Sequence, residues 1–405
     1  MSRISRLSIA PLAALAVGIG GAAHAQSKPD FKVGLMLPYK GIYGELAKAV
    51  DNGWQIAIEE HRGSVAGRKI ALVSEDTESN PTVAVQKSTK VIQSDRVDVM
   101  AGVISSGVAI ALGQLAGREK KPIVFALAVA DGITGENCNP YVARTSFSGH
   151  AFQYSAGQYW SKRYKTAVTL GPDYAAGHSF LGNPPKYPGG FRKGFEDGGG
   201  KIVDQLWSAF QKTKDWGPFL VKAKDSGAQI IYSFYGGSES IQVVKQHSDF
   251  GLARQLPLVG DQWLYDELLW EAMGDVVVGT KHVTSHVPEL KHKANVEFVA
   301  AHTKKFGHSP DVNAYLGYEN AKAVLMAVDK LGGDTADGAK LIKTMATNDY
   351  TDKMPRGKFS FNKDNNAVVH QLYMVEIVKE GGKLKKKYLE TLPGAQDLPG
   401  CKMSG

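Results

Sequence analysis

The chain has 405 residues, of which 43% are hydrophobic, and its 48 Lys and Arg residues against 40 Asp and Glu residues give a net charge of +8. It contains no low-complexity tract and no heptad repeat, so its composition excludes a disordered or fibrous protein and favours a globular one. Much of the positive charge lies in short runs such as Lys383–Lys387, which has no interleaved aromatic residues. Such a run is typical of an exposed loop or strand edge, so nucleic-acid binding is not indicated.

The first 25 residues have the pattern of a secretory signal peptide. Arg3 and Arg6 form a basic start, Leu7–Ile19 is an apolar core, and Ala23–Ala25 supplies a small-residue cleavage pattern. The apolar core is shorter than the ~20 residues that span a bilayer, so we expect cleavage rather than a membrane anchor. The cleavage site has no cysteine that could carry a lipid. We therefore expect an exported, soluble and monomeric protein in the periplasm.

The remaining chain is longer than one hydrophobic core usually holds, which predicts two lobes. In its first part, short apolar runs alternate with helical stretches, a pattern that indicates parallel α/β layering. The expected strands are Phe31–Leu37, Lys69–Ser74, Val97–Ile104 and Ile123–Leu127. The expected helices are Tyr43–Glu60, Pro81–Ser94 and Val108–Arg118.

The same alternation begins again after an irregular stretch over Asp131–Ser148. The expected strands here are Thr166–Leu170, Lys201–Leu206, Gln229–Phe234, Leu256–Val259 and Val276–Val283, with helices over Gly190–Glu196, Trp216–Asp225 and Ser238–Phe250. A helical block follows over Lys291–Phe306, Tyr315–Leu331 and Ala336–Thr347. The chain returns to strands over Gly357–Phe361, Val368–Val378 and Leu384–Glu390.

These elements predict an α/β protein of two lobes, each a mainly parallel β-sheet flanked by helices. We expect the late helices to cover the first sheet and the late strands to join the second. Lobe 1 would then comprise residues 26–146 and 284–350, lobe 2 residues 147–283 and 351–390, and residues 391–405 would form a C-terminal tail. The chain would cross between the lobes near Thr145–Ser148, Lys281–Ser285 and Tyr350–Met354. Three crossings form a hinge that lets two lobes close on each other.

Ser105, Ser106 and Gly107 lie where the strand Val97–Ile104 ends and the next helix begins. A helix N-terminus offers free backbone N–H groups and a positive dipole end, and the serines add hydroxyls, so the turn suits a carboxylate or another small anion. Taken alone, the motif is more often an ordinary serine N-cap. Its position favours a site, because ligands of such sheets bind beyond the carboxyl ends of the strands.

Other strand ends carry residues that could reach the same ligand. Several are aromatic residues beside glycines, which suit a closing cleft because rigid rings bury area at little entropic cost. A single tyrosine of this kind is more often plain packing, but here the pattern recurs at several strand ends. The candidates at these positions are Tyr43, Ala128, Ala130, Asp131, Tyr174, Tyr235, Asp261 and Gln262.

Together these features resemble the solute-binding proteins of ABC importers with the type I periplasmic-binding fold, in the branched-chain amino acid (Leu/Ile/Val) receptor branch. The resemblance covers nearly all of the mature chain and depends on the order of the motifs. The motifs are Val33–Pro38, Tyr43–Gly44, Gly53–Glu60, Val73–Pro81, Gly102–Gly107, Pro122–Asp131, Gly171–Gly177, Tyr235–Gly237 and Leu258–Asp261. The resemblance implies a receptor that captures a small carboxylate by hinge closure and partners an ABC permease and ATPase.

By this resemblance the carboxylate-binding role falls on Ser106, with Ser105 and either Ala128 or Ala130 beside it. This role agrees with the anion site that the turn itself suggests.

By the same resemblance, Tyr43 and Tyr174 would pack on the ligand from opposite lobes, and Tyr235 would add a ring from the second lobe. One position departs from the family pattern. Family members that bind an α-amino group use an acidic residue where this chain has Asp261 and Gln262, and Gln262 lies at least as close to the expected acidic position. An aromatic or other organic carboxylate without an ammonium therefore competes with a branched-chain amino acid as the ligand.

Cys138 and Cys401 are the only cysteines. In an exported chain an even pair suggests a disulfide, here between the C-terminal tail and a loop of the first half, and two free buried thiols are the alternative.

Other classes of function are less well supported. Five histidines lie close together in sequence but lack zinc-site spacing, so we expect surface histidines and neither metal nor cofactor; they are His282, His286, His292, His302 and His308. An exported hydrolase is an alternative, but the chain lacks a Gly-x-Ser-x-Gly elbow, and we expect no enzyme. Within the binding class, the protein could instead serve a chemoreceptor or sensor kinase.

Overall fold

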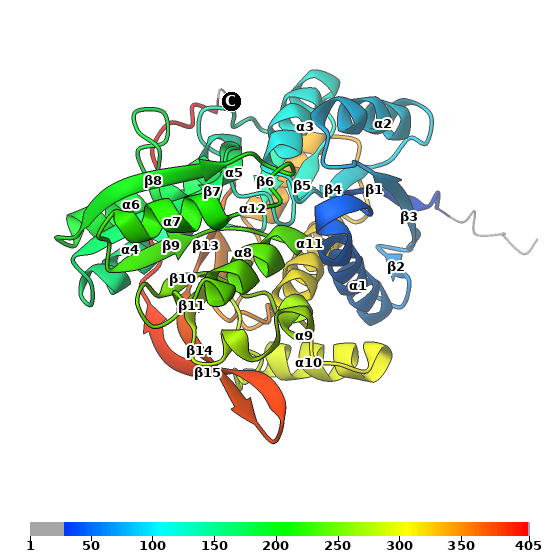
Figure 1. Ribbon diagram of the computed structural model, residues 1–405. Helices are drawn as coiled ribbons and strands as arrows, with labels where there is room; N and C mark the ends of the chain where they lie inside the picture. Colours follow the sequence, from blue (N-terminus) through cyan, green and yellow to red (C-terminus); the bar gives the residue numbers. More distant parts are fainter. Residues whose placement is uncertain (1–27, 404–405) are drawn as a thin grey trace, which may run out of the picture.

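The computed structural model describes residues 28–403, and these residues form two lobes, each built on its own large β-sheet (Figure 1). The signal peptide predicted for residues 1–25 lies outside the described residues. The predicted fold class, an α/β protein with two mainly parallel sheets flanked by helices, is confirmed. None of the helices in residues 28–403 is long and apolar enough to cross a membrane.

The first sheet has the strand order β2-β3-β1-β4-β5-β6. Its strands are β1 (Phe31–Leu37), β2 (Ser64–Val65), β3 (Arg68–Asp76), β4 (Val99–Gly102), β5 (Ile123–Phe125) and β6 (Val142–Arg144). All neighbours are parallel except β2 and β3, which form a short hairpin. The helices between them are α1 (Gly44–Glu60), α2 (Pro81–Gln93) and α3 (Ser106–Glu119).

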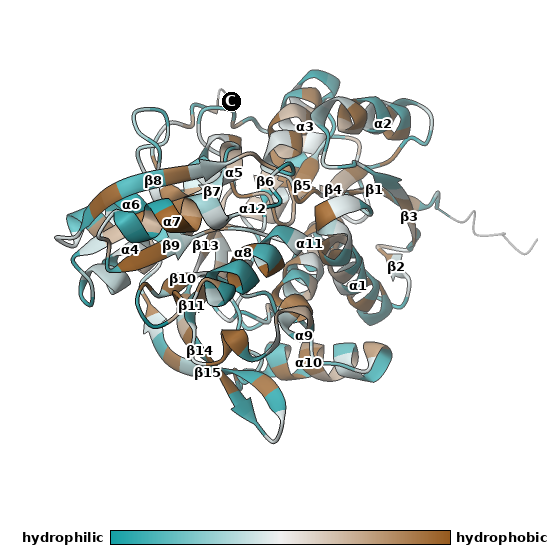
Figure 2. Ribbon diagram, viewed as in Figure 1, coloured by the Kyte–Doolittle hydropathy of each residue, from teal (hydrophilic) through white to brown (hydrophobic). Residues whose placement is uncertain are grey.

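The second sheet has the order β15-β14-β11-β10-β9-β7-β8. Its strands are β7 (Thr166–Pro172), β8 (Lys201–Ser208), β9 (Ile230–Ser233), β10 (Leu258–Asp261), β11 (Lys281–Thr284), β14 (Leu372–Glu380) and β15 (Lys383–Leu392). Strands β7 to β11 run parallel, and β14 and β15 add an antiparallel hairpin. Of the late strands expected to join the second sheet, β14 and β15 do so, whereas the segments Phe359–Phe361 and Val368–His370 pair only with each other. Figure 2 shows bands of hydrophobic and hydrophilic colour along β8 and β15, the two edge strands.

Helices of the second lobe are α4 (Gly149–Ser161), α5 (Ala175–Leu181), α6 (Gly190–Asp197), α7 (Gly217–Asp225), α8 (Ser238–Asp249) and α9 (Trp270–Met273). Single-turn 3₁₀ helices are η1 (Gly41–Tyr43), η2 (Asp131–Ile133), η3 (Glu267–Leu269) and η4 (Gly274–Val277). A small separate sheet pairs β12 (Phe359–Phe361) with β13 (Val368–His370).

The late helices α10 (Lys293–Phe306), α11 (Val312–Lys330) and α12 (Gly338–Ala346) lie with the first lobe (Figure 1). Helix α11 packs directly on α1, and two glycines make that approach possible. A Cβ atom at Gly53 would lie 2.3 Å from the carbonyl oxygen of Ala314, and one at Gly317 would lie 2.3 Å from that of Val50. Both distances are far below van der Waals contact, so the two backbones can meet this closely only without side chains at these positions.

The structure differs from the sequence expectations in several elements. The stretch Asp131–Ser148, predicted to be irregular, contains β6, and the expected strand Val276–Val283 divides into η4 and the shorter β11. Val276 and Val278 are exposed, so an apolar run here does not correspond to a buried strand.

The chain passes between the two sheets after β6, after β11 and before β14. Before the third passage, Asn366 still contacts the first lobe, because its Nδ2 donates to the carbonyl oxygen of Val142 at 3.2 Å and Ala367 forms a bridge with Arg144. We propose that the first two crossings lie where the sequence suggested. The third crossing lies at the start of β14 and not at Tyr350–Met354.

The C-terminal tail returns from β15 to the first lobe. A disulfide joins Cys138 to Cys401, with the Cα atoms 5.5 Å apart. The disulfide that the cysteine pair suggested is therefore present, and the tail spans both lobes.

Candidate functional site

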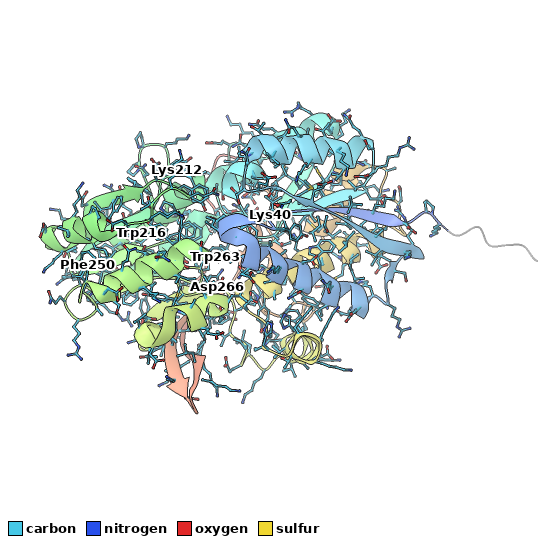
Figure 3. All side chains as sticks on the ribbon, turned by 45° about the vertical axis from the view of Figure 1, so that its right-hand side comes forward. Lys40, Lys212, Trp216, Phe250, Trp263 and Asp266 are labelled. Carbon is cyan, nitrogen blue, oxygen red and sulfur yellow. A yellow bond between two sulfur atoms is a disulfide. The ribbon has the colours of Figure 1, made fainter. Side chains whose placement is uncertain are left out.

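A narrow pocket lies between the lobes, at the carboxyl ends of the strands, and leaves only about 20 Å³ open to the centre of a water molecule. This is room for about one water molecule, so its walls must move apart to admit a larger solute. Figure 3 shows one lining residue, Trp263, between the second lobe and helix α1 of the first. The lining residues are Tyr43, Leu46, Ile104, Leu127 and Val129 from the first lobe and Tyr174, Ala176, Phe234, Gly236 and Trp263 from the second.

Two tyrosines join the lobes across this pocket. Tyr43 ends η1 in the first lobe, Tyr174 precedes α5 in the second, and their hydroxyl oxygens are 3.0 Å apart, within hydrogen-bond distance. The ring of Phe210 stacks on Tyr174 with centroids 3.9 Å apart and an interplanar angle of 5°. Burial raises the pKa of both phenols, so they are neutral at physiological pH.

The lobes also meet closely beside this tyrosine pair. Gly237 has a φ of +64°, and a Cβ atom there would lie 1.9 Å from the carbonyl oxygen of Ile42 in the opposite lobe. Only glycine combines this backbone conformation with so close a contact. The structure is therefore a closed form, in which the start of α8 rests on η1.

Aromatic rings form the wall contributed by the second lobe. Phe234 stacks on Phe180 with centroids 4.4 Å apart, and Trp263 lies edge-on to both rings. The indole Nε1 of Trp263 donates to Oδ1 of Asn313 at 3.1 Å, and Asn313 Nδ2 in turn donates to Asp266 at 2.7 Å. Asn313 belongs to α11, so the first lobe fixes the indole in place.

The predicted anion turn follows β4 directly. Val103 has a φ of +65°, a left-handed conformation that is an outlier for a β-branched residue and is found mainly at functional sites. Ser105 is the N-cap of α3, and Ser106 is its first helical residue. Ser106 Oγ accepts hydrogen bonds from the backbone N–H groups of Val129 and Ala130, both at 3.1 Å.

These two contacts use Ser106 Oγ only as an acceptor. In the described part of the chain the hydroxyl proton of Ser106 has no assigned acceptor, although the side chain is fully buried. Ser106 is two residues after the lining residue Ile104 and accepts from the backbone of the lining residue Val129, so it adjoins the lining without belonging to it. The backbone N–H groups of the first turn of α3 also lack intrahelical partners, as in any helix.

The carboxylate of Asp261, at the end of β10, is already engaged. Its oxygens accept from the backbone N–H groups of Trp263 at 2.9 Å and Leu264 at 3.2 Å, and from Nε2 of Gln153 at 2.6 Å. Burial raises the pKa of Asp261 to about 7, although these hydrogen bonds act in the opposite direction. The side chain shapes the turn that presents Trp263 and does not line the pocket.

Gln262 points to the second crossing segment. Its Oε1 accepts from the backbone N–H of Ser285 at 2.8 Å, from Ser285 Oγ at 3.0 Å and from Thr284 Oγ1 at 3.3 Å. Tyr235 lies within the core of the second lobe, where its hydroxyl is 2.7 Å from Ser208 Oγ. Neither side chain lines the pocket.

Asp131 connects the lobes near the first crossing. Its Oδ1 accepts from the backbone N–H of His150 at 2.8 Å, and its own N–H donates to Ser179 Oγ at 3.0 Å. Burial raises the pKa of Asp131 to about 7. The carbonyl oxygen of Ala128 accepts from Ser146 at 2.8 Å, so this loop is held mainly by protein contacts.

Of the ten candidate residues, the structure brings Tyr43 and Tyr174 to the pocket lining. Ser105, Ala128 and Ala130 are next to lining residues in the chain, and Ser106 is two residues from Ile104. The other four side chains bond elsewhere. Sequence reasoning missed most of the apolar wall, Trp263 included. In residues 28–403 no group of three or more His, Cys, Asp or Glu side chains is arranged to hold a metal ion.

The sequence matches the family model described as periplasmic binding protein over residues 30–383. A curated relative, Leu/Ile/Val-binding protein homolog 6 of Brucella melitensis biotype 1, is 26% identical over 96% of this chain and 98% of its own length.

Solved structures of ABC-transporter solute-binding proteins are also similar to this chain. A solute-binding protein of an ABC transporter from R. palustris, in complex with benzoate, is 31% identical with a TM-score of 0.84, over 92% of this chain and 100% of its own. Another from Rhodopseudomonas palustris BisB5, in complex with 3,4-dihydroxy benzoic acid, is 29% identical with a TM-score of 0.82, over 91% of this chain and 98% of its own. A leucine-binding protein from Thermotoga maritima is 22% identical with a TM-score of 0.76, over 89% of this chain and 98% of its own, and shares the fold.

Proposed function

The chain belongs to the periplasmic binding protein family, and we propose that it is the extracytoplasmic receptor of an ABC importer for a small aromatic carboxylate. It would capture this solute by closure of its two lobes, without catalysis, and present it to a membrane permease and ATPase. The proposed ligand has a carboxylate and an apolar ring but no α-ammonium group.

The observation that carries this proposal is the chemistry of the pocket lining. Among residues 28–403 the lining side chains include four aromatic rings and no acidic or basic group. Asp261, the acidic residue expected to neutralise an ammonium, already accepts three hydrogen bonds from the protein. An amino acid would therefore bury its ammonium without a counter-charge, which is strongly unfavourable.

The turn after β4 is the proposed anchor of the ligand carboxylate. Ser106 has a hydroxyl proton free to donate, and the first turn of α3 adds backbone N–H groups and the positive end of its dipole. Charge-assisted hydrogen bonds of this type are stronger than neutral ones. One anchored carboxylate would orient the ring toward Phe234 and Trp263.

Lobe closure then follows from the position of the pocket. Tyr43 contributes to one wall and Tyr174 to the other, so a ligand between them contacts both lobes only in the closed form. A ligand shifts such an equilibrium by its difference in affinity for the two forms. The benzoate and dihydroxybenzoate complexes of the similar Rhodopseudomonas palustris proteins support an aromatic carboxylate as the solute.

A thermal-shift assay with matched ligands tests this proposal. Benzoate should raise the melting temperature of the purified chain in a concentration-dependent manner, because it binds only the folded state. The pair 4-methylpentanoate and L-leucine share one carbon skeleton and differ in the α-ammonium, so any stabilisation by the pair should come from the former. Stabilisation by L-leucine and none by benzoate would contradict the proposal.

A further inference from the structure

We propose that the C-terminal tail takes part in ligand binding by placing Asp397 beside Arg144, which positions the loop that orients Ser106. This inference rests on the proposed function, because it takes Ser106 as the anchor of the ligand carboxylate. Arg144 and Asp397 are positioning residues, since neither lines the pocket and both act through Ser106. The disulfide between Cys138 and Cys401 keeps the tail, and with it Asp397, on the first lobe.

Arg144 holds the loop that supplies both backbone donors to Ser106. Its Nη1 donates to the carbonyl oxygen of Ala130 at 2.9 Å. The backbone N–H groups of Val129 and Ala130 each donate to Ser106 Oγ at 3.1 Å. These two bonds use both lone pairs of the hydroxyl oxygen, so they fix the direction in which its proton is donated. The position of the loop therefore decides where Ser106 can donate.

Arg144 carries a charge that the protein interior must neutralise. The side chain is fully buried, and in residues 28–403 its Nε and Nη2 atoms have no hydrogen-bond partner. A buried charge is strongly unfavourable without an opposite charge beside it. Asp397 Oδ1 lies 3.8 Å from Arg144 Nη2, and Asn365 Nδ2 donates to Asp397 Oδ2 at 2.8 Å. Asp131 is a second carboxylate near Arg144, but burial raises its pKa to about 7, so it is only partly ionised at neutral pH.

The tail that carries Asp397 starts in the opposite lobe. It follows β15 of the second lobe, where Ser155 Oγ on α4 donates to the carbonyl oxygen of Pro393. The disulfide attaches its other end, at Cys401, to Cys138 of the first lobe. Asp397 lies between these two attachments, so it belongs to a segment held at both ends. Holding both ends lowers the conformational entropy that is lost when the Asp397 carboxylate is fixed in place.

A double-mutant cycle separates this positioning role from a general loss of stability. Asp397→Asn keeps the size of the side chain but removes its charge, and it should weaken benzoate binding by roughly three- to thirtyfold. In the Ser106→Ala background the same change should have little further effect, because the hydroxyl that the loop orients is gone. Calorimetric titration at pH 7 measures the affinities of the wild type, the two single variants and the double variant. Asp275→Asn is the control, since it breaks an exposed ion pair with Lys379 and should leave the benzoate affinity unchanged.

Loss of the disulfide should have the same effect as loss of the Asp397 charge. The double variant Cys138→Ser, Cys401→Ser frees one end of the tail, so it should bind benzoate about as weakly as Asp397→Asn does. Adding Asp397→Asn to this variant should not weaken binding further. A benzoate affinity equal to that of the wild type in the cysteine variant would overturn the inference.

Other outcomes distinguish the inference from the proposed function. Equal weakening by Asp397→Asn with and without the Ser106 hydroxyl would overturn the inference and leave the receptor function standing. A lower melting temperature with unchanged benzoate affinity would do the same, because the tail would then only stabilise the fold. Failure of the wild-type protein to bind benzoate would overturn both.

Discussion

Glu319 and Arg356 form a fully buried ion pair that ties together the segments connecting the two lobes. Arg356 Nε donates to Glu319 Oε2 at 2.6 Å, and Arg356 Nη2 donates to the carbonyl oxygen of Thr145 at 2.7 Å. On the other side of the carboxylate, His286 Nε2 lies 3.6 Å from Glu319 Oε1. Thr145 follows β6 and His286 follows β11, so residues from the first two crossings meet around this buried ion pair.

Replacing Glu319 should strongly destabilise the fold. Glu319→Gln leaves the guanidinium of Arg356 charged and buried without its counter-ion, which typically costs about 3–5 kcal/mol. Urea unfolding measures this loss. Lys293→Ala is the control, because it breaks an exposed pair with Glu297 and should cost no more than about 0.5 kcal/mol. A Glu319→Gln protein as stable as the Lys293→Ala protein would refute the structural role of the buried pair.

The expectation of surface histidines is wrong for His282, His286 and His302, which are buried. Buried His286 should make the folded state sensitive to acid. Burial lowers the pKa of His286 from 6.5 to about 4, although neighbouring Glu319 acts to raise it and Arg356 and Lys386 act to lower it. The unfolded chain binds a proton here below about pH 6.5 and the folded chain only near pH 4, so folding is progressively disfavoured as the pH falls between these values. A shift of this size corresponds to up to roughly 3 kcal/mol.

The difference between the wild type and His286→Gln isolates this contribution. The free energy of unfolding of the wild type, relative to the variant, should decrease from pH 6.5 to pH 4. Burial would raise the pKa of Glu319, but Arg356 lowers it from 4.5 to about 2, so Glu319 also loses stabilising effect as the pH falls toward 4. This second contribution is present in both proteins, so the difference between them reports on His286. Parallel stability profiles of the two proteins would show that His286 does not titrate as described.

Ser106→Ala should weaken binding of benzoate. The variant removes the proposed charge-assisted hydrogen bond to the carboxylate, worth ~1.5–3 kcal/mol, or roughly ten- to a hundredfold in affinity. Calorimetry at pH 7 measures the change. Ser88→Ala serves as a control, since Ser88 is a buried serine on α2 that does not line the pocket. Equal affinities for the two variants would remove Ser106 from the anchor.

Gly237→Ala should impair closure while leaving each lobe folded. The added Cβ would lie 1.9 Å from the carbonyl oxygen of Ile42, a contact that exists only between closed lobes. Gly251→Ala is closely matched, because Gly251 also has a positive φ, +69°, but no atom within 4 Å of an added Cβ. We expect benzoate affinity to fall by at least about tenfold beyond any effect of the control, since tenfold corresponds to about 1.4 kcal/mol. If both variants bind alike, the Gly237 contact does not limit closure.

Most strands and helices could be predicted because short apolar runs, which form strands buried on both faces, alternate with amphipathic helical stretches. Helix α4 escaped this reasoning because its residues, including Phe152 and Trp160, are buried nearly all round, so no polar face marks its period. Strand β6 has only three residues, too few to show a pattern. Helix α11 is also buried nearly all round, but it has 19 residues against 13 in α4, and length helps to separate a buried helix from a buried strand.

The site was harder to predict from the sequence than the fold. The positions of Tyr43 and Tyr174 follow from the rule that ligands bind beyond strand ends, and both line the pocket. The engagement of Asp261 could not be predicted, because its partner Gln153 lies 108 residues away and on α4, the helix that periodicity did not reveal. Long-range hydrogen bonds of this kind decide which polar groups remain free for a ligand.

The central claim is that the pocket binds an aromatic carboxylate and has no place for an ammonium. Isothermal titration of the purified chain with benzoate and with L-leucine tests it most directly. The account predicts saturable binding of one benzoate per chain and no heat of binding from L-leucine at the same concentrations. Binding of L-leucine with benzoate unable to compete would contradict it.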